Sequence, residues 1–132
     1  MRFLGIDYGS KNIGLALSDE QGRFAYPYRV IPNTARAAMM VSKICEDEGV
    51  DQVVVGESKD FKGVDNPIAK EINEFKTALA GIIDLPIKSE LEVLTTAAAR
   101  RDIGQDDSTD ARAAALILKS YLEREVKWLV NY

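Results

Sequence analysis

Residues 3–19 read FLGIDYGSKNIGLALSD, and this stretch decides the fold. Residues 2–8 are apolar and β-prone, a turn follows at residues 9–12, and a second β-prone run occupies residues 13–17. The short connection predicts a β-hairpin. A third β-prone run, at residues 25–31, is set off by turn-forming residues on both sides, so the three runs predict an antiparallel meander on one side of a sheet.

The remaining sequence alternates between helical and strand patterns. Apolar spacing predicts a helix over residues 35–48, with Asn33-Thr34 as its cap and Gly49 at its end. Residues 52–56, QVVVG, are typical of a buried strand, and reaching them through a helix implies a right-handed parallel crossover. We then expect a polar loop at 57–66, a helix from Pro67, a strand at 85–93, a short helix at 95–103, a loop at 104–107 and a last helix from Ser108. The order βββαβαβαα predicts an α/β fold, with a mixed five-stranded sheet and helices on its faces.

Size and residue types limit the possible functions. With 132 residues, 46% of them hydrophobic, the chain is expected to form a single domain over residues 1–132 with its own core. One cysteine, Cys45, excludes an internal disulfide, and the absence of histidine excludes Ser-His-Asp, Cys-His and zinc-histidine chemistry. The amino terminus is too short and too polar for a signal peptide or a membrane span, so we expect a cytoplasmic protein.

The charge of the chain weighs mildly against a nucleic-acid partner. The net charge is −4 and the pI is about 4.9, whereas phosphate binding usually leaves a basic footprint. Basic residues do gather locally at Lys59 and Lys62, at Lys70 and at Arg100-Arg101. The ordinary interpretation of each group is solvated surface.

Three acidic residues occupy positions where chemistry is possible. Asp7 ends an otherwise apolar strand, Glu92 ends the fifth predicted strand with Glu90 on the same face, and Asp110 falls in the first turn of the last helix. Each has a plain structural explanation as well: a turn, a half-solvated strand, and an interaction with the helix dipole. Taken together they suggest more, because carboxylates converging from separate elements can hold Mg²⁺ and hydrolyse a phosphodiester without histidine.

Four motifs in order then resemble one family. FLGIDYGSKNIGLALSD resembles the first motif of the YqgF (RuvX) family, relatives of the RuvC Holliday-junction resolvases with an RNase H-like fold. VVVGES (53–58) resembles that family's Val-Gly-Leu-Pro strand end, and LEVLTTAAAR (91–100) its Asp-Glu-Arg-Leu-Ser-Thr-x-x-Ala-Arg motif. STDARAAALILKSYLE (108–123) resembles its closing helix. The resemblance covers essentially the whole chain.

The resemblance implies a site and an activity. It places the family's catalytic, metal-binding carboxylates on Asp7, Glu92 and Asp110, choosing Glu92 over Glu90, with Mg²⁺ or Mn²⁺ as cofactor. It also matches three residues that would contact the substrate: Lys11, Thr96 and Arg100. The implied activity is that of a hydrolase, a nuclease acting on structured nucleic acid: the 5′ end of pre-16S rRNA, which we favour, or branched DNA. A monomer would suit rRNA trimming and a weak homodimer a symmetric junction.

The chain departs from the family pattern at several positions. Glu57-Ser58 replaces the usual Leu-Pro, Leu91 replaces an aspartate and Val93 an arginine, and the loop before Asp110 reads GQDDST where lysine is usual. Each change removes a positive charge, a rigid turn or a neighbour of a ligand.

Two alternatives belong to other classes. The phosphate loop of the actin, Hsp70 and sugar-kinase group also reads roughly Gly-Ile-Asp-x-Gly, but those proteins bind ATP between two such domains and need more than twice this length. A non-enzymatic RNase H-like module that binds RNA or a protein is the second alternative, motivated by the net negative charge and the altered flanks of Glu92.

Overall fold

The computed structural model of the chain describes residues 1–58, 67–92 and 107–125. In these ranges the elements follow the order β1 (Phe3–Tyr8), β2 (Asn12–Ser18), β3 (Ala25–Pro32), α1 (Ala37–Glu48), β4 (Gln52–Ser58), α2 (Pro67–Ala80), β5 (Ile87–Glu92) and α4 (Asp107–Glu125). The five predicted strands and the three long helices are therefore confirmed. The predicted short helix at 95–103 lies outside the described residues.

One mixed sheet organises the molecule. Its strand order is β3-β2-β1-β4-β5, with β1–β2 and β2–β3 antiparallel and β1–β4 and β4–β5 parallel. The meander and the parallel crossover predicted from the sequence are both present. Because β1, β4 and β5 run in the same direction, their carboxyl ends lie along one edge of the sheet.

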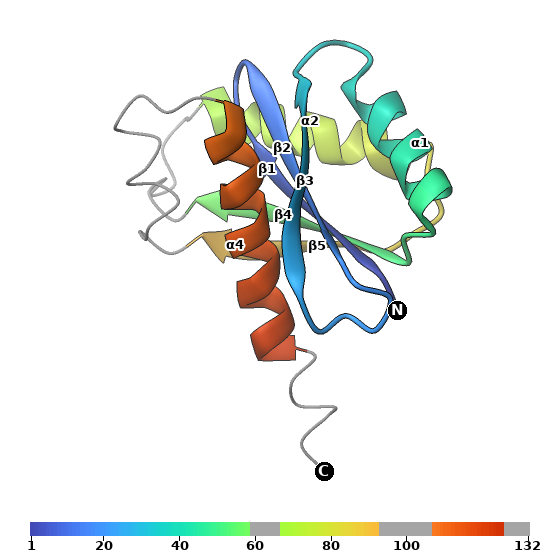
Figure 1. Ribbon diagram of the computed structural model, residues 1–132. Coiled ribbons are helices and arrows are strands. Elements are labelled where there is room, and N and C mark those ends of the chain that lie inside the picture. The colour runs from blue at the N-terminus through green and yellow to red at the C-terminus, as the bar shows by residue number, and fades with distance from the viewer. Residues whose placement is uncertain (59–66, 93–106, 126–132) are drawn as a thin grey trace.

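Helices α1 and α2 cover one face of this sheet and α4 covers the other (Figure 1). Strand alternation divides the core accordingly: Leu4 and Ile6 face α1 and α2, whereas Phe3 faces α4. Burying a leucine or isoleucine of this kind stabilises the fold by about 1.5 to 3 kcal/mol. No helix in the described ranges is both long enough and apolar enough to cross a membrane.

Two strand glycines allow α4 to lie close to the sheet. A Cβ atom built on Gly5 would lie 2.8 Å from Cβ of Leu118 and 3.0 Å from the carbonyl oxygen of Ala114. A Cβ atom on Gly56 would overlap the side chain of Ile117. Glycine inside a strand commonly marks such a close approach, and here it sets the distance between the helix and the sheet.

Two of the differences from the predicted element boundaries have a clear physical reason. Strand β4 continues through Glu57 and Ser58, which were predicted to be loop, because both pair with β5. Helix α1 begins at Ala37 rather than at residue 35, with Arg36 at the N-cap position and no side-chain cap bond. The Thr34 hydroxyl instead accepts the backbone N–H of Arg36 at 3.2 Å, which forms a turn before the helix.

Candidate functional site

Asp7 lies near the end of β1, at the edge where β4 and β5 also end. Its side chain is only 3% exposed, and it shares its face of the strand with Phe3 and Gly5, the face that α4 covers. Burial of a carboxylate is costly unless polar or charged groups compensate for it. Asp7 therefore occupies a position that an apolar residue would fill at lower cost if packing alone mattered.

The pairing of β4 with β5 locates the two glutamates of β5. Gly56 is opposite Glu90 and Ser58 is opposite Glu92. Since alternate residues share a face, both glutamates occupy register positions on the side of the sheet that α4 covers. Glu92 is the last residue of β5, two residues or roughly 7 Å closer to the strand ends than Glu90.

Glu90 has partners that give it a structural role. It is 2% exposed, and its Oε2 atom accepts hydrogen bonds from the Ser120 hydroxyl at 2.9 Å and from Nη1 of Arg124 at 3.0 Å. A second guanidinium nitrogen of Arg124 pairs with Oε1. This link between β5 and α4 was not predicted from the sequence; its one signal is the i, i+4 spacing of Ser120 and Arg124 on a helix.

The contacts of α4 fix its alignment against β1. The ring of Tyr121 lies 6.1 Å from that of Phe3, and Leu118 and Ala114, about one and two helical turns earlier, flank Gly5. The helix therefore runs antiparallel to β1, with one turn, roughly 5.4 Å, matching two strand residues, roughly 6.6 Å. Asp7 lies two strand residues beyond Gly5, so the turn of α4 that precedes Ala114, which is the first turn of the helix, lies level with Asp7.

Asp110 belongs to that first turn of α4. Its neighbour Ala111 is 7% exposed, so the helix is already packed on the sheet at this level. The backbone register thus brings the positions of Asp7, Glu92 and Asp110 to the same edge of the sheet. The side chains of Glu92 and Asp110 lie outside the described part of the chain, as do Thr96 and Arg100.

Lys11 lies in the turn between β1 and β2, next to the same edge, and is exposed. Its carbonyl oxygen accepts the backbone N–H of Asn33 at 2.9 Å, and the Asn33 side chain donates to the carbonyl of Gly9 at 2.8 Å. The turn that carries Lys11 is thereby held against the segment after β3. Its ammonium group is available to a ligand at the edge that also carries Asp7.

A polar cluster lies on the opposite face of the same edge. Lys76 of α2 pairs with Glu57 of β4 and donates to the Ser89 hydroxyl at 2.8 Å, and Ser89 donates to Glu57 at 2.6 Å. Burial acts to raise the pKa of Glu57, but the hydrogen bonds from Lys76 and Ser89 outweigh it and lower the pKa below its ordinary value. The cluster compensates the change from leucine to glutamate at position 57 and joins the ends of β4 and β5.

Metal binding depends on side chains that lie partly beyond the described ones. Among the residues whose side chains are described, no three acidic or cysteine groups gather closely enough to hold an ion. The donor chemistry of the three predicted positions suits a hard divalent cation, because all three are carboxylates and Mg²⁺ prefers carboxylate oxygen.

Comparison with known proteins identifies the family. The family model "RuvX: Holliday junction resolvase" matches residues 1–124. The chain belongs to the RuvX family. A proposed pre-16S rRNA nuclease of Maridesulfovibrio salexigens is 34% identical over 134 residues, covering 94% of this chain and 99% of the relative. Another from Chloroflexus aggregans is 35% identical over 130 residues, covering 91% and 92%.

Solved structures support the fold of this RuvX chain. RuvC of T. thermophilus, solved in complex with a Holliday junction substrate, superposes with a TM-score of 0.63 at 17% identity and covers 96% of both chains. The Holliday junction resolvase of fowlpox virus gives a TM-score of 0.55 at 16% identity, covering 93% of this chain and 98% of the resolvase. The RNase H-like, RuvC-like fold expected from the sequence is confirmed.

Proposed function

We propose that this RuvX protein is a metal-dependent nuclease that hydrolyses phosphodiester bonds in structured nucleic acid, with Asp7, Glu92 and Asp110 as ligands of Mg²⁺ or Mn²⁺. The observation that carries the proposal is the shared edge: parallel β1 and β5 and antiparallel α4 bring these three positions to one level. The second support is the involvement of Glu90 with Ser120 and Arg124, which gives Glu90 a structural role and so favours Glu92 as the ligand of the two glutamates of β5.

Different residues of the chain would hold the ion and contact the substrate. The three carboxylates hold the ion, and burial of Asp7 keeps its carboxylate in a fixed position. Lys11, and by family resemblance Thr96 and Arg100, contact the substrate phosphates. When bound, the ion supplies an activated water and stabilises the charge on the oxygens of the scissile phosphate.

For the substrate we favour the 5′ region of pre-16S rRNA over branched DNA. The two relatives described above are proposed pre-16S rRNA nucleases, and the chain covers nearly their full length. The T. thermophilus and fowlpox proteins are Holliday junction resolvases, but their identity to this chain is 17% and 16%, so their likeness supports the fold alone.

Metal titration and cleavage together test the proposal. Wild-type protein should bind Mn²⁺ in calorimetry and cut a pre-16S rRNA fragment, whereas Asp7→Asn, Glu92→Gln and Asp110→Asn should fold but lose both properties. Glu123→Gln, an exposed acid on α4, is the matched control and should behave as wild type. Equal trace activity in all variants would show that the cleavage comes from a contaminant and that the assignment is wrong.

The same experiment separates the non-enzymatic alternative, an RNase H-like module that binds RNA without cutting it. A binding module would retain RNA in a gel-shift assay without Mn²⁺ and would leave the fragment intact with it. A four-way DNA junction assayed in parallel distinguishes the two nuclease substrates.

A further inference from the structure

A groove of about 600 Å³ lies between strand β3 and helix α1, on a different part of the molecule from the edge that carries Asp7. Its apolar surface comes from Tyr28 of β3 and from Met39, Met40 and Ile44 of α1. Met39 is 63% exposed and adds apolar surface to the lining of the groove. Charged residues complete the lining: Arg29, Arg36, Lys43, Asp47 and Glu48.

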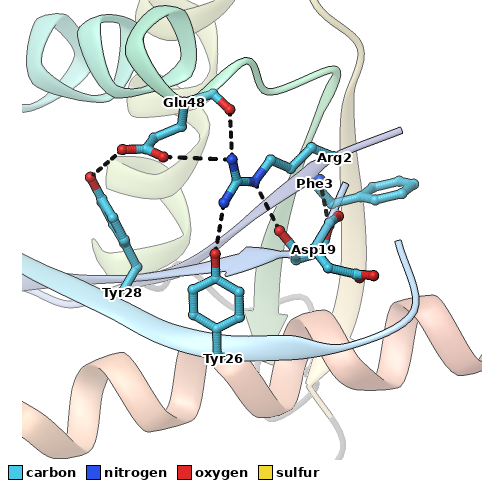
Figure 2. A network of polar contacts seen from close by, with 7 residues as sticks. Arg2, Phe3, Asp19, Tyr26, Tyr28 and Glu48 are labelled. Atoms are coloured by element: carbon cyan, nitrogen blue, oxygen red, sulfur yellow. Dashed lines mark hydrogen bonds and ion pairs between the residues drawn. The ribbon is translucent and has the colours of Figure 1, made fainter. Parts of the chain in front are cut away.

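One end of this β3–α1 groove is held rigidly. Figure 2 shows the Tyr28 hydroxyl directed at Glu48, to which it donates at 3.0 Å, and the guanidinium of Arg2 between Glu48 and Tyr26. Arg2 donates to the Tyr26 hydroxyl at 2.7 Å and to the carbonyl of Ser18 at 3.0 Å. Because the network already fixes the ring of Tyr28, binding of a ligand in the groove would cost no further conformational entropy at this side chain.

The groove borders an edge of the sheet. Strand β3 is the outermost strand and, within the described residues, pairs only with β2. Figure 1 shows α1 running beside this outer strand. Pro27 and Pro32 have no N–H group, and the register with β2 shifts at Tyr28, because Leu15 pairs with Arg29 and Ala16 with Pro27. The regular stretch with donors beyond this bulge is therefore Arg29 to Ile31. In such a stretch alternate residues direct their N–H and C=O groups away from the paired neighbour.

The charges in the groove are unevenly compensated. Asp47 pairs with Lys43 at 2.9 Å, and Glu48 is engaged by Arg2 and Tyr28. Arg29 and Arg36 have no carboxylate partner among the described side chains. An occupant should therefore carry a negative charge near the two arginines and apolar groups along the rest of the groove.

We propose that this groove binds an extended segment of a partner protein, which adds to β3 as a further strand. The segment would hydrogen-bond the regular stretch from Arg29 to Ile31, insert alternate apolar side chains beside Met40 and Ile44, and place an acidic residue by Arg36. A polynucleotide is disfavoured because the floor of the groove is apolar and offers nothing to a run of phosphates. The inference does not depend on the proposed nuclease activity.

Random octapeptides displayed on phage, panned against the immobilised full chain, test the proposal. The enriched peptides should alternate apolar residues and carry an acidic residue at one end. Synthetic copies should lose affinity at least about tenfold with Arg36→Glu or Met40→Lys. Matched controls on other surfaces are Lys119→Glu and Ile82→Lys, an apolar residue 51% exposed, and both should bind as wild type.

Amide hydrogen exchange supplies a second readout that does not require the variants to fold. Peptide binding should slow amide exchange between Arg29 and Ile31 and leave β5 unchanged. Three results would overturn the proposal: no enriched sequence, enriched peptides that bind the groove variants as well as wild type, or binding of oligouridylate RNA that Arg36→Glu abolishes.

Discussion

The buried carboxylate of Glu90 is paired with the guanidinium of Arg124, and this contact joins the strand that carries Glu92 to the helix that carries Asp110. Glu90 is 2% exposed whereas the side chain of Arg124 is 54% exposed, so the arginine covers the carboxylate from the solvent side. The Ser120 hydroxyl is the second donor. The pair therefore stabilises the fold and helps to set the distance between the strand and the helix that carry two of the proposed metal ligands.

Replacing Arg124 should be costly for this reason. Arg124→Met leaves a buried carboxylate with one neutral donor, and because water can partly reach the vacated position we expect a loss of about 2 kcal/mol in the free energy of unfolding. Urea denaturation measures it. Lys119→Met, an exposed cation on the same helix, should change stability by less than about 0.5 kcal/mol. Equal effects of the two substitutions would contradict a structural role for the pair.

Gly5 provides a test of the alignment between α4 and the sheet. Gly5→Ala would place a Cβ atom against the backbone oxygen of Ala114 and Cβ of Leu118, neither of which can rotate away. We expect a loss of about 1 to 3 kcal/mol from overpacking, measured by thermal unfolding, and weaker Mn²⁺ binding because α4 must shift away from β1. Gly81→Ala is the control, because its Cβ atom would meet the carbonyl oxygens of Ala78 and Thr77 only at the ordinary contact distances of 3.5 and 3.7 Å. Unchanged Mn²⁺ affinity in Gly5→Ala would show that the metal site does not depend on this packing.

The strands were predictable because their patterns are local. Residues 3–8 and 13–17 alternate or run apolar between clear turn residues, and the sheet can be inferred from them. The continuation of β4 through Glu57 was not predictable, since a glutamate at a strand end is normally solvated. Only the pairing with β5 and the contacts with Lys76 and Ser89 explain it.

The candidate site was only partly predictable for a similar reason. Asp7 stands out because it interrupts an apolar strand, but nothing in the residues of β5 alone separates Glu90 from Glu92. Family resemblance chose Glu92, and the structure adds a physical reason, because Glu90 is engaged by α4. Such a contact joins residues 34 positions apart and depends on tertiary packing.

The pKa of Glu57 should respond to Lys76. Lys76→Met removes the cation while burial remains, so the pKa of Glu57 should rise, as measured by carboxyl-carbon NMR during a pH titration. Because the folded pKa lies below the unfolded value of 4.5, the stabilisation is present above pH 4.5 and is lost as the pH falls through the folded pKa. The variant should therefore lose less stability than wild type over that acidic range. Lys70→Met, an exposed lysine on the same helix, should leave the titration of Glu57 unchanged.

The buried thiol of Cys45 predicts how the stability of the protein changes at alkaline pH. Its side chain is 4% exposed, and burial raises the pKa of the thiol from 9.0 to about 11. The unfolded chain therefore loses this proton first, so the contribution of Cys45 to stability is complete below pH 9 and is lost as the pH rises toward 11. Two pKa units correspond to about 2 to 3 kcal/mol. The difference in unfolding free energy between wild type and Cys45→Ala should shrink by this amount between pH 8 and pH 11, since the lysines and tyrosines common to both proteins cancel. A difference that stays constant with pH would mean that the thiol titrates at its ordinary value and that water reaches it in the folded state.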